Sequence, residues 1–251
     1  MEVFFGIVIT ILGLLIGSFL NVCIFRIPKK IFFAQSRSFC PKCNAQLKWY
    51  ENIPVFSYIF LKGKCRTCKN KISYRYPLVE LLNCLMYLFA YLKWGVSVTL
   101  LINCMFISAL IVMAFIDLDT MEIPNGLVLF VILLGAVSFL PQYSSVLWWE
   151  KLIGMVCVSV PFFVISLLTR GGIGGGDIKL MFACGLLLGW QLTLVSTLIG
   201  LIFGSIIAII MMIIAKGQGK RRIPFGPILA VGMVLGLFVG EYLLKWYGSF
   251  F

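Results

Sequence analysis

Four carboxylates and a run of glycines are the residues of this sequence best suited to chemistry. Asp117, Asp119 and Glu122 lie together in AFIDLDTMEIPN, and Asp177 follows five glycines in GGIGGGDIKL. Two carboxylates a few ångströms apart do not easily both ionise, so one holds a proton while the other acts as a base. Such a pair would activate water and protonate a leaving amine, which is the chemistry of aspartyl proteolysis.

Each of these residues also has an ordinary structural explanation. Asp177 precedes an apolar helix and would serve as its N-cap, whereas Asp119 and Glu122 would be solvated loop charges. The glycines would form a hinge or a close-packed turn, or would let an extended peptide approach Asp177. Ionisable groups at membrane depth are energetically unfavourable and usually have a function. The two acidic sites together therefore favour a functional interpretation more strongly than either does alone.

Helical geometry limits how the carboxylates meet. Positions two apart on a helix point about 200° away from each other, so only one of Asp117 and Asp119 would face Asp177. The residues alone leave open which one it is. The chain contains no histidine, which excludes a His-dependent Ser or Cys nucleophile and a His-liganded metal centre.

Two Cys-x-x-Cys motifs form a second candidate site. Cys40 and Cys43 lie in CPKC, and Cys65 and Cys68 lie in CRTC. Four thiolates in a tetrahedral array suit zinc, and a closed four-sulfur site would be structural because it leaves no open position for substrate. Two disulfides are the competing interpretation, but thiols stay reduced in the cytosol.

The elements that position these residues are predicted to be membrane helices. Hydrophobic residues make up 61% of the chain and charged residues 12%, about half the charged fraction of soluble domains. The composition predicts an all-α polytopic membrane protein with about eight transmembrane helices, the first an anchor rather than a removed signal peptide. The predicted spans are about 3–25, 76–93, 98–116, 125–141, 148–169, 178–191, 192–214 and 226–246.

The distribution of Lys and Arg predicts the orientation. With eight spans and the N-terminus outside, 18 of the 21 basic residues fall in inner loops, and twelve of these lie between Arg26 and Arg75. This positive-inside bias puts the cysteine loop and the carboxylates on the cytosolic side. The net charge of +12 is then explained by a basic face toward anionic lipid, with no nucleic acid as a partner.

The predicted organisation has three parts. Residues 1–25 form the first transmembrane helix, 26–76 a small cytosolic zinc-binding loop domain between the first and second helices, and 77–251 a membrane-embedded core with the carboxylates.

Motifs along most of the chain resemble those of the type IV prepilin peptidases, a family of bifunctional leader peptidases and N-methyltransferases. The matching stretches are GSFLNVCIFRIP, both Cys-x-x-Cys motifs, ENIPVFSYIFLKGKCRTC, RYPLVELL, IDLDTMEIPN, GGGD and IPFGPILA. The resemblance implies that Asp117 and Asp177 are catalytic, with Gly174 and Gly176 of the G-x-G-D signature, and Asp119, as supporting residues.

The resemblance also implies substrates, a cofactor and a location. The substrates would be prepilins or pseudopilins of pilus, competence or secretion systems, with a short basic leader cut just before a hydrophobic helix. S-adenosylmethionine would supply the methyl group for the new N-terminus, in the cell membrane of a prokaryote. The sequence has no Rossmann-type glycine fingerprint for this cofactor, and Gly63 and Glu80 are weak candidates for its site.

Two other classes of protein remain open at this point. A transporter would also keep intramembrane acids and glycine-broken helices, and it predicts carboxylate-dependent flux without peptide cleavage. A zinc-bearing membrane scaffold would explain the cysteines alone and predicts that the carboxylates are dispensable.

Overall fold

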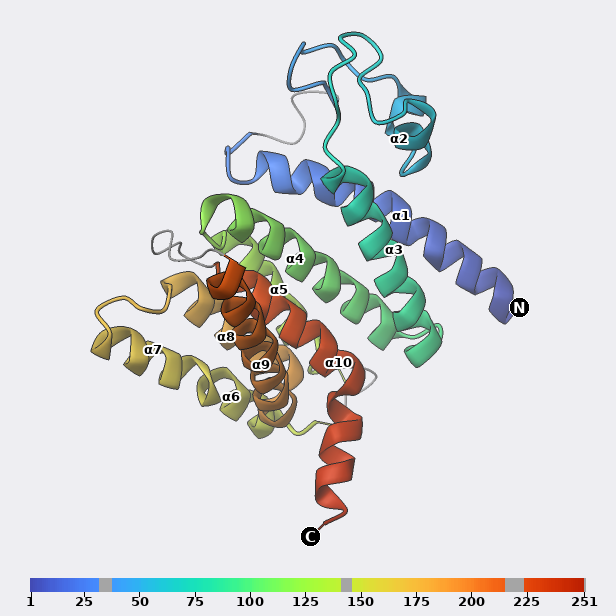
Figure 1. Ribbon diagram of the computed structural model, residues 1–251. Helices are drawn as coiled ribbons and strands as arrows, with labels where there is room; N and C mark the ends of the chain where they lie inside the picture. The colour runs from blue at the N-terminus through green and yellow to red at the C-terminus, as the bar shows by residue number, and fades with distance from the viewer. Residues whose placement is uncertain (32–37, 141–145, 215–223, 251) are drawn as a thin grey trace. The chain divides into compact units, whose positions relative to one another are not determined.

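A computed structural model describes residues 1–31, 38–140, 146–214 and 224–250. The regular structure of these residues is helical, with two isolated β-bridges in the cysteine loop. The chain divides into two compact units, Met1–Val112 and Met113–Phe251. Figure 1 shows the helices of both units.

The first unit is built on two helices that pack side by side, α1 (Glu2–Arg26) and α3 (Arg75–Trp94). The segment between them carries a 3-10 helix, η2 (Trp49–Asn52), and a short helix, α2 (Phe56–Phe60). Glycines let the helix backbones approach, because a Cβ at Gly17 would lie 2.7 Å from the Cα of Glu80. A Cβ at Gly13 would lie 2.9 Å from the Cα of Cys84, so this is a small-xxx-small helix contact.

Buried polar side chains add hydrogen bonds between the helices of the first unit. Asn83 Nδ2 donates to the carbonyl of Gly13 at 2.8 Å, and the Ser108 hydroxyl donates to Asn83 Oδ1 at 3.0 Å. The Tyr87 and Ser108 hydroxyls are also 3.0 Å apart. The chain of contacts links α1, α3 and the first part of α4 (Val98–Thr120), as polar groups commonly do between membrane helices.

The second unit begins within α4, and most of its helices contact α8 (Gly175–Leu188). The partners of α8 are α5 (Asn125–Val137), α6 (Trp148–Cys157), α7 (Ser159–Leu168), α9 (Trp190–Ile214) and α10 (Gly226–Gly248). Most side chains of α8 from Leu180 to Leu188 are buried. Gly154 of α6 and Gly185 of α8 meet backbone to backbone, with no room for a Cβ on either.

Each of the eight predicted apolar segments contains helix, but the membrane spans are fewer by length and composition. Five candidate spans are found among the described residues: Glu2–Arg26, Val98–Thr120, Trp148–Leu168, Trp190–Ile210 and Gly226–Gly248. Of the other three predicted spans, α5 is apolar but shorter, α8 has 14 residues, and α3, with 20 residues, is not among the candidates. The protein is therefore all-helical and multi-pass, whereas the count of eight transmembrane helices remains a prediction.

Two predicted boundaries are resolved by the backbone. The predicted segments 178–191 and 192–214 form separate helices, because α8 ends at Leu188 and its C-cap is Gly189, whose φ of +79° suits glycine. The segment 148–169 is interrupted at Val158. The end of the predicted span 125–141 and the basic residues at 216–222 lie outside the described residues.

Candidate active site and metal centre

Asp117 is held at the end of α4 by the start of α10. Its side chain is buried, with 5% of its surface exposed. The backbone N–H of Gly226 donates to Asp117 Oδ2 at 2.9 Å. Gly226 is the first residue of α10, so this N–H has no acceptor within its own helix. The helix N-terminus therefore supplies both a donor and a partial positive charge to the carboxylate.

Asp177 occupies the first turn of α8, and it is not the N-cap. The N-cap is Gly174, with φ −66° and ψ 140°, so Asp177 is the third helical residue. Its carboxylate accepts a hydrogen bond from the backbone of Gly174, the backward bond that an acid at this position makes in a capping box. The side chain is buried, with 9% exposed. Asp177 is therefore not the N-cap residue, although its side chain does help to cap the helix.

The glycines before Asp177 allow close contacts. A Cβ at Gly174 would lie 3.0 Å from Asp177 Oδ2, which is tighter than an ordinary contact. A Cβ at Gly176 would lie 3.0 Å from the Cβ of Ile123, in the loop that follows α4. A side chain at Gly174 would displace the Asp177 carboxylate, and one at Gly176 would push the start of α8 away from Ile123 in the loop after α4.

The two buried aspartates lie near each other in the second unit. They lie close enough for the charge of Asp117 to act on Asp177, and both are positioned by residues at helix N-termini. Asp119, two residues along α4, is exposed, as is Glu122. The helical geometry therefore separates Asp117 from Asp119 in the way that the sequence predicts. Chemically, the site offers two carboxylates that can share a proton and activate water.

Gly226 and Ile123 are parts of this site that residue-by-residue reasoning from the sequence missed. Both occur in motifs quoted for the resemblance, IPFGPILA and IDLDTMEIPN. Pro227 is the one local signal, because proline is favoured in the first turn of a helix and marks the start of α10. The contact between Gly226 and Asp117 joins residues 109 positions apart, which no local pattern predicts.

The four predicted cysteines come together in the first unit. The sulfurs of Cys40, Cys43, Cys65 and Cys68 all lie within 4.8 Å of one another. A cluster of this kind could hold a metal such as zinc, because four thiolates are a common set of zinc ligands. The sulfurs are present as free cysteines rather than as disulfides.

The two Cys-x-x-Cys motifs adopt the same backbone turn. The N–H of Cys40 donates to the carbonyl of Ala45, and the N–H of Cys65 donates to the carbonyl of Asn70. The fifth residue of each turn has a positive φ, 55° at Asn44 and 57° at Lys69. The segment is thus a structural duplication in which each half presents two thiols.

Local hydrogen bonds also prepare the Cys68 thiol to bind a metal. A hydrogen bond from the backbone of Asn70 is the main cause that lowers the pKa of Cys68 to about 6. The Asn70 side-chain amide adds a contact at 3.4 Å to the same sulfur. Since a metal binds the thiolate form, this environment favours Cys68 as a ligand at neutral pH, whereas burial and the neighbouring thiols raise the pKa of Cys43 to about 11.

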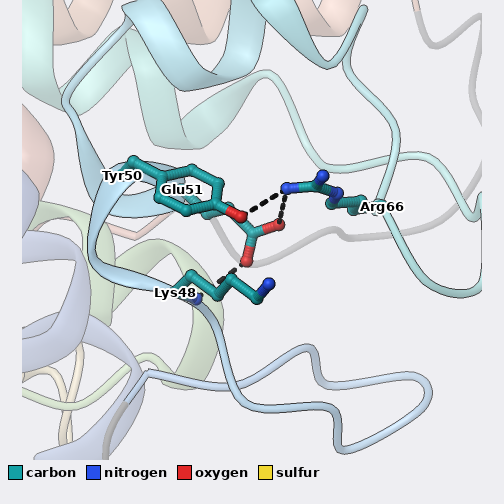
Figure 2. Close-up of polar contacts among 4 residues, drawn as sticks. All are labelled: Lys48, Tyr50, Glu51 and Arg66. Atoms are coloured by element: carbon teal, nitrogen blue, oxygen red, sulfur yellow. Dashed lines mark hydrogen bonds and ion pairs between the residues drawn. The ribbon is translucent and has the colours of Figure 1, made fainter.

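Polar contacts tie the second cysteine motif to the segment between the motifs (Figure 2). Arg66 Nη1 donates to the Tyr50 hydroxyl and lies 3.8 Å from Glu51 Oε1. The other oxygen of Glu51 accepts the backbone N–H of Lys48 at 2.8 Å. Figure 2 shows Arg66 between the Tyr50 hydroxyl and the Glu51 carboxylate, which connects η2 with the CRTC turn.

A cavity of about 380 Å³ lies in the first unit beside the cysteine cluster. Its volume is within the range of small-molecule sites. The walls combine charged groups, side-chain amides and aromatic rings, namely Glu51, Glu80, Arg26, Asn21, Asn52, Phe25, Phe39, Tyr58 and Tyr76, with Cys40 and Cys65 at one side. Lys42, Arg66 and Lys71 also line the cavity, so four cations face two carboxylates. The carboxylates and rings would suit cationic and heteroaromatic parts of a ligand, and the cations would suit an anionic group on it.

Of the two weak cofactor candidates, only Glu80 is among the residues that line this cavity. Its carboxylate is 7% exposed and accepts the backbone N–H of Val55 at 2.7 Å. Val55 has φ +62°, a strained conformation for a β-branched residue. Gly63 instead makes a turn with φ +66° against the ring of Tyr58.

Comparison with known proteins identifies the class of protein that this fold and site define. Residues 11–94 match the Bacterial Peptidase A24 N-terminal domain, which covers most of the first unit. Residues 104–209 match the Type IV leader peptidase family, and this match includes both buried aspartates. The chain is thus similar to this peptidase class in both of its units.

Full-length relatives give the family more specifically. The prepilin leader peptidase/N-methyltransferase of Bacillus subtilis is 32% identical over 96% of each chain. Proteins of the same name from Neisseria gonorrhoeae and Pseudomonas aeruginosa are 38% and 32% identical, over 88% and 96% of this chain and 86% and 92% of their own. The chain belongs to the prepilin leader peptidase/N-methyltransferase family. No solved structure matches it.

Proposed function

We propose that this protein cleaves the leader peptide of type IV prepilins or pseudopilins and N-methylates the new N-terminal residue. The observation that carries the proposal is the pair of buried carboxylates, Asp117 and Asp177, in a chain whose relatives are leader peptidases along nearly their whole length. The transporter and scaffold alternatives are not favoured, because neither accounts for these relatives.

Cleavage is assigned to the aspartate pair. One carboxylate takes a proton from water as the water attacks the scissile carbonyl, and the other donates its proton to the leaving amide nitrogen. Gly226 and Gly174 donate backbone hydrogen bonds that orient the two carboxylates. Gly176 keeps the start of α8 against Ile123, and Asp119 lies exposed nearby, where it would meet a basic leader.

Zinc is assigned to Cys40, Cys43, Cys65 and Cys68 as a structural ion. The support is the spacing of the four sulfurs and the duplicated turn. Four thiolates would complete a tetrahedral site and close the loop domain 26–76. The proposed membrane-embedded core, residues 77–251, contains most of α3 from the first unit together with the whole second unit.

S-adenosylmethionine is assigned to the cavity of the first unit, whose size and donor groups fit it. The cofactor would supply a methyl group from its sulfonium. Glu80 offers a carboxylate to its ammonium, ribose hydroxyls or positive sulfur, Asn52 offers an amide, and Phe39 and Tyr58 offer rings to its base.

The proposed location is the cell membrane of a prokaryote. Eight membrane crossings with an outside N-terminus would put the zinc loop and the aspartates on the cytosolic side, where 18 of 21 basic residues fall. The basic leader of a substrate would then stay in the cytosol while its apolar helix enters the bilayer.

The test is the mass of a prepilin N-terminus in cells with and without this protein. We expect loss of the leader and a gain of one methyl group only when the protein is present. Asp117→Ala and Asp177→Ala should each reduce cleavage by roughly 100-fold or more, since each removes half of the acid–base pair. Unprocessed prepilin in the presence of folded protein would contradict the proposal.

A further inference from the structure

A buried charge of each sign lines the cavity of the first unit. Glu80 and Arg26 both belong to its wall, and they are only 7% and 5% exposed. A buried charge is unfavourable unless an opposite charge or hydrogen bonds stabilise it, and the low dielectric around it strengthens its attraction for an opposite charge. These two side chains are therefore suited to hold oppositely charged parts of one ligand.

The other charged groups of the wall are less suited to a ligand. Glu51 and Arg66 lie 3.8 Å apart, and the Arg66 side chain is 55% exposed. The second oxygen of Glu51 accepts the backbone N–H of Lys48. Lys42 and Lys71 are exposed, so water and salt screen their charges. A ligand would therefore meet the least competition from water and from protein groups at the two buried charges.

The packing of α1 against α3 sets the distance between the buried charges. Gly17 of α1 lies against the backbone of Glu80, and Asn21 Nδ2 donates to the carbonyl of Tyr76 at 3.1 Å, so the two helices run in opposite directions. Arg26 lies nine residues beyond Gly17 on α1, which is about 13 Å along the helix axis.

The direction of helical side chains shortens this distance. A long side chain on a helix leans toward the N-terminus of that helix, so Arg26 of α1 and Glu80 of α3 lean toward each other. The guanidinium and the carboxylate then come within roughly 10 Å of each other. A gap of this size fits the zwitterionic end of an amino acid, whose carboxylate and ammonium are bonded to one carbon and would each contact one partner at about 3 Å.

Protein contacts fix the orientation of the Glu80 carboxylate. One oxygen accepts the Val55 N–H at 2.7 Å, and the Ser18 hydroxyl also donates to the carboxylate. Val55 has φ 62° and ψ −51°, and the N–H of Phe56 donates to the carbonyl of Pro54 at 2.6 Å. This is a γ-turn of the rare, strained form. Strain of this kind clusters at ligand sites, where it preorganises the groups that bind.

We propose that Arg26 binds the carboxylate at the amino-acid end of S-adenosylmethionine, and that Glu80 binds the ammonium group beside it. The assignment rests on the methyltransferase function proposed above, and it names the residue that distinguishes this cofactor from adenosine compounds without a carboxylate. The guanidinium offers two parallel N–H donors that match a carboxylate in geometry, which a lysine ammonium does not.

Two ligands that differ only in this carboxylate test the proposal. The purified protein in lipid nanodiscs is titrated with S-adenosylmethionine and with decarboxylated S-adenosylmethionine, and each Kd is measured by calorimetry. The unsubstituted protein should bind S-adenosylmethionine roughly tenfold or more tightly, since only this ligand makes the charge-assisted hydrogen bonds to Arg26. In Arg26→Gln, the two Kd values should lie within about threefold of each other, because the charge that separates them is gone.

Lys71→Gln is the matched control, because it removes the same charge from an exposed position in the same wall. The ratio of its two Kd values should stay within about twofold of the unsubstituted protein's ratio. Arg26→Lys keeps the charge but loses the planar fork, so its ratio should be intermediate. Tm is measured for every variant, and Arg26→Lys decides the question if Arg26→Gln does not fold.

The outcomes separate the role of Arg26 from the proposed function. Equal Kd values in the unsubstituted protein, or an unchanged ratio in folded Arg26→Gln or Arg26→Lys, would overturn the role of Arg26. A ratio that is lost in Lys71→Gln would overturn it too, because the carboxylate would then bind at Lys71. If the unsubstituted protein binds neither ligand, the methyltransferase proposal itself is wrong, and the role of Arg26 is wrong with it.

Discussion

The contact between Gly226 and Asp117 gives the sharpest prediction. In Gly226→Ala, the new Cβ would lie 2.7 Å from Asp117 Oδ2 and 3.0 Å from its Cγ. Ordinary van der Waals contact begins at 3.4 Å, so the oxygen must retreat by about 0.7 Å (3.4 − 2.7). This movement would also strain the 2.9 Å hydrogen bond from the Gly226 N–H.

The expected effect is on catalysis rather than on folding. A misplacement of about 1 Å in a reacting group can cost on the order of 100-fold in rate, so kcat/KM for prepilin cleavage should fall by roughly 30- to 100-fold. Alanine is a better helix former than glycine, so the first turn of α10 should not unfold. The assay is cleavage of full-length prepilin in proteoliposomes, with Tm measured on the same preparation.

Gly126→Ala is the matched control. Gly126 lies in the first turn of α5, and a Cβ there would meet no atom within 4 Å. Cleavage should stay within about twofold of the unsubstituted protein, and Tm should not fall. If Gly226→Ala keeps full kcat/KM with an unchanged Tm, the carboxylate of Asp117 does not need its observed position, and the assignment of the site would be refuted.

Three further predictions concern the same sites. Asp177→Asn keeps an acceptor for the Gly174 N–H but cannot exchange a proton, so the rate of cleavage should fall roughly 100-fold or more while Tm is retained. The exposed Asp119→Ala should reduce the rate of cleavage far less. A cleavage-competent Asp177→Asn protein would show that Asp177 only caps the helix. Purified protein should carry about one zinc per chain by elemental analysis, and the double variant Cys40→Ser, Cys43→Ser should lose it; full occupancy in this variant would exclude the proposed ligands. Asp117→Asn should abolish cleavage, but this variant should still methylate a pre-cleaved peptide that begins with Phe. The reason is that the proposed cofactor cavity beside Glu80 belongs to the other unit. Loss of both activities in a folded variant would indicate one shared site.

Much of the fold follows from local sequence. The eight apolar segments predict the helices to within a few residues in most cases, because hydrophobic length depends only on neighbours along the chain. The Cys-x-x-Cys motifs are equally local, since each turn brings its own two sulfurs together. The broken helix at Val158 also has a local cause in Pro161, which removes one backbone donor.

The membrane count was less predictable. Helices α5 and α8 are apolar but only 13 and 14 residues long, short of the roughly 20 that cross a bilayer. Hydropathy along the chain shows that such segments avoid water. It does not distinguish a short helix that spans the bilayer from a helix packed among other helices of the protein.

The aspartate site required both kinds of information. Sequence alone placed Asp117 and Asp119 on opposite sides of one helix, since their angular separation follows from the helical repeat. Only the tertiary structure buries Asp117 beneath the N-terminus of α10 and leaves Asp119 exposed. It also puts Asp177 in the first turn of α8 rather than at the N-cap, and it brings Gly176 against Ile123. These contacts join residues more than fifty positions apart, and they depend on how helices pack, which no periodicity within a single segment encodes.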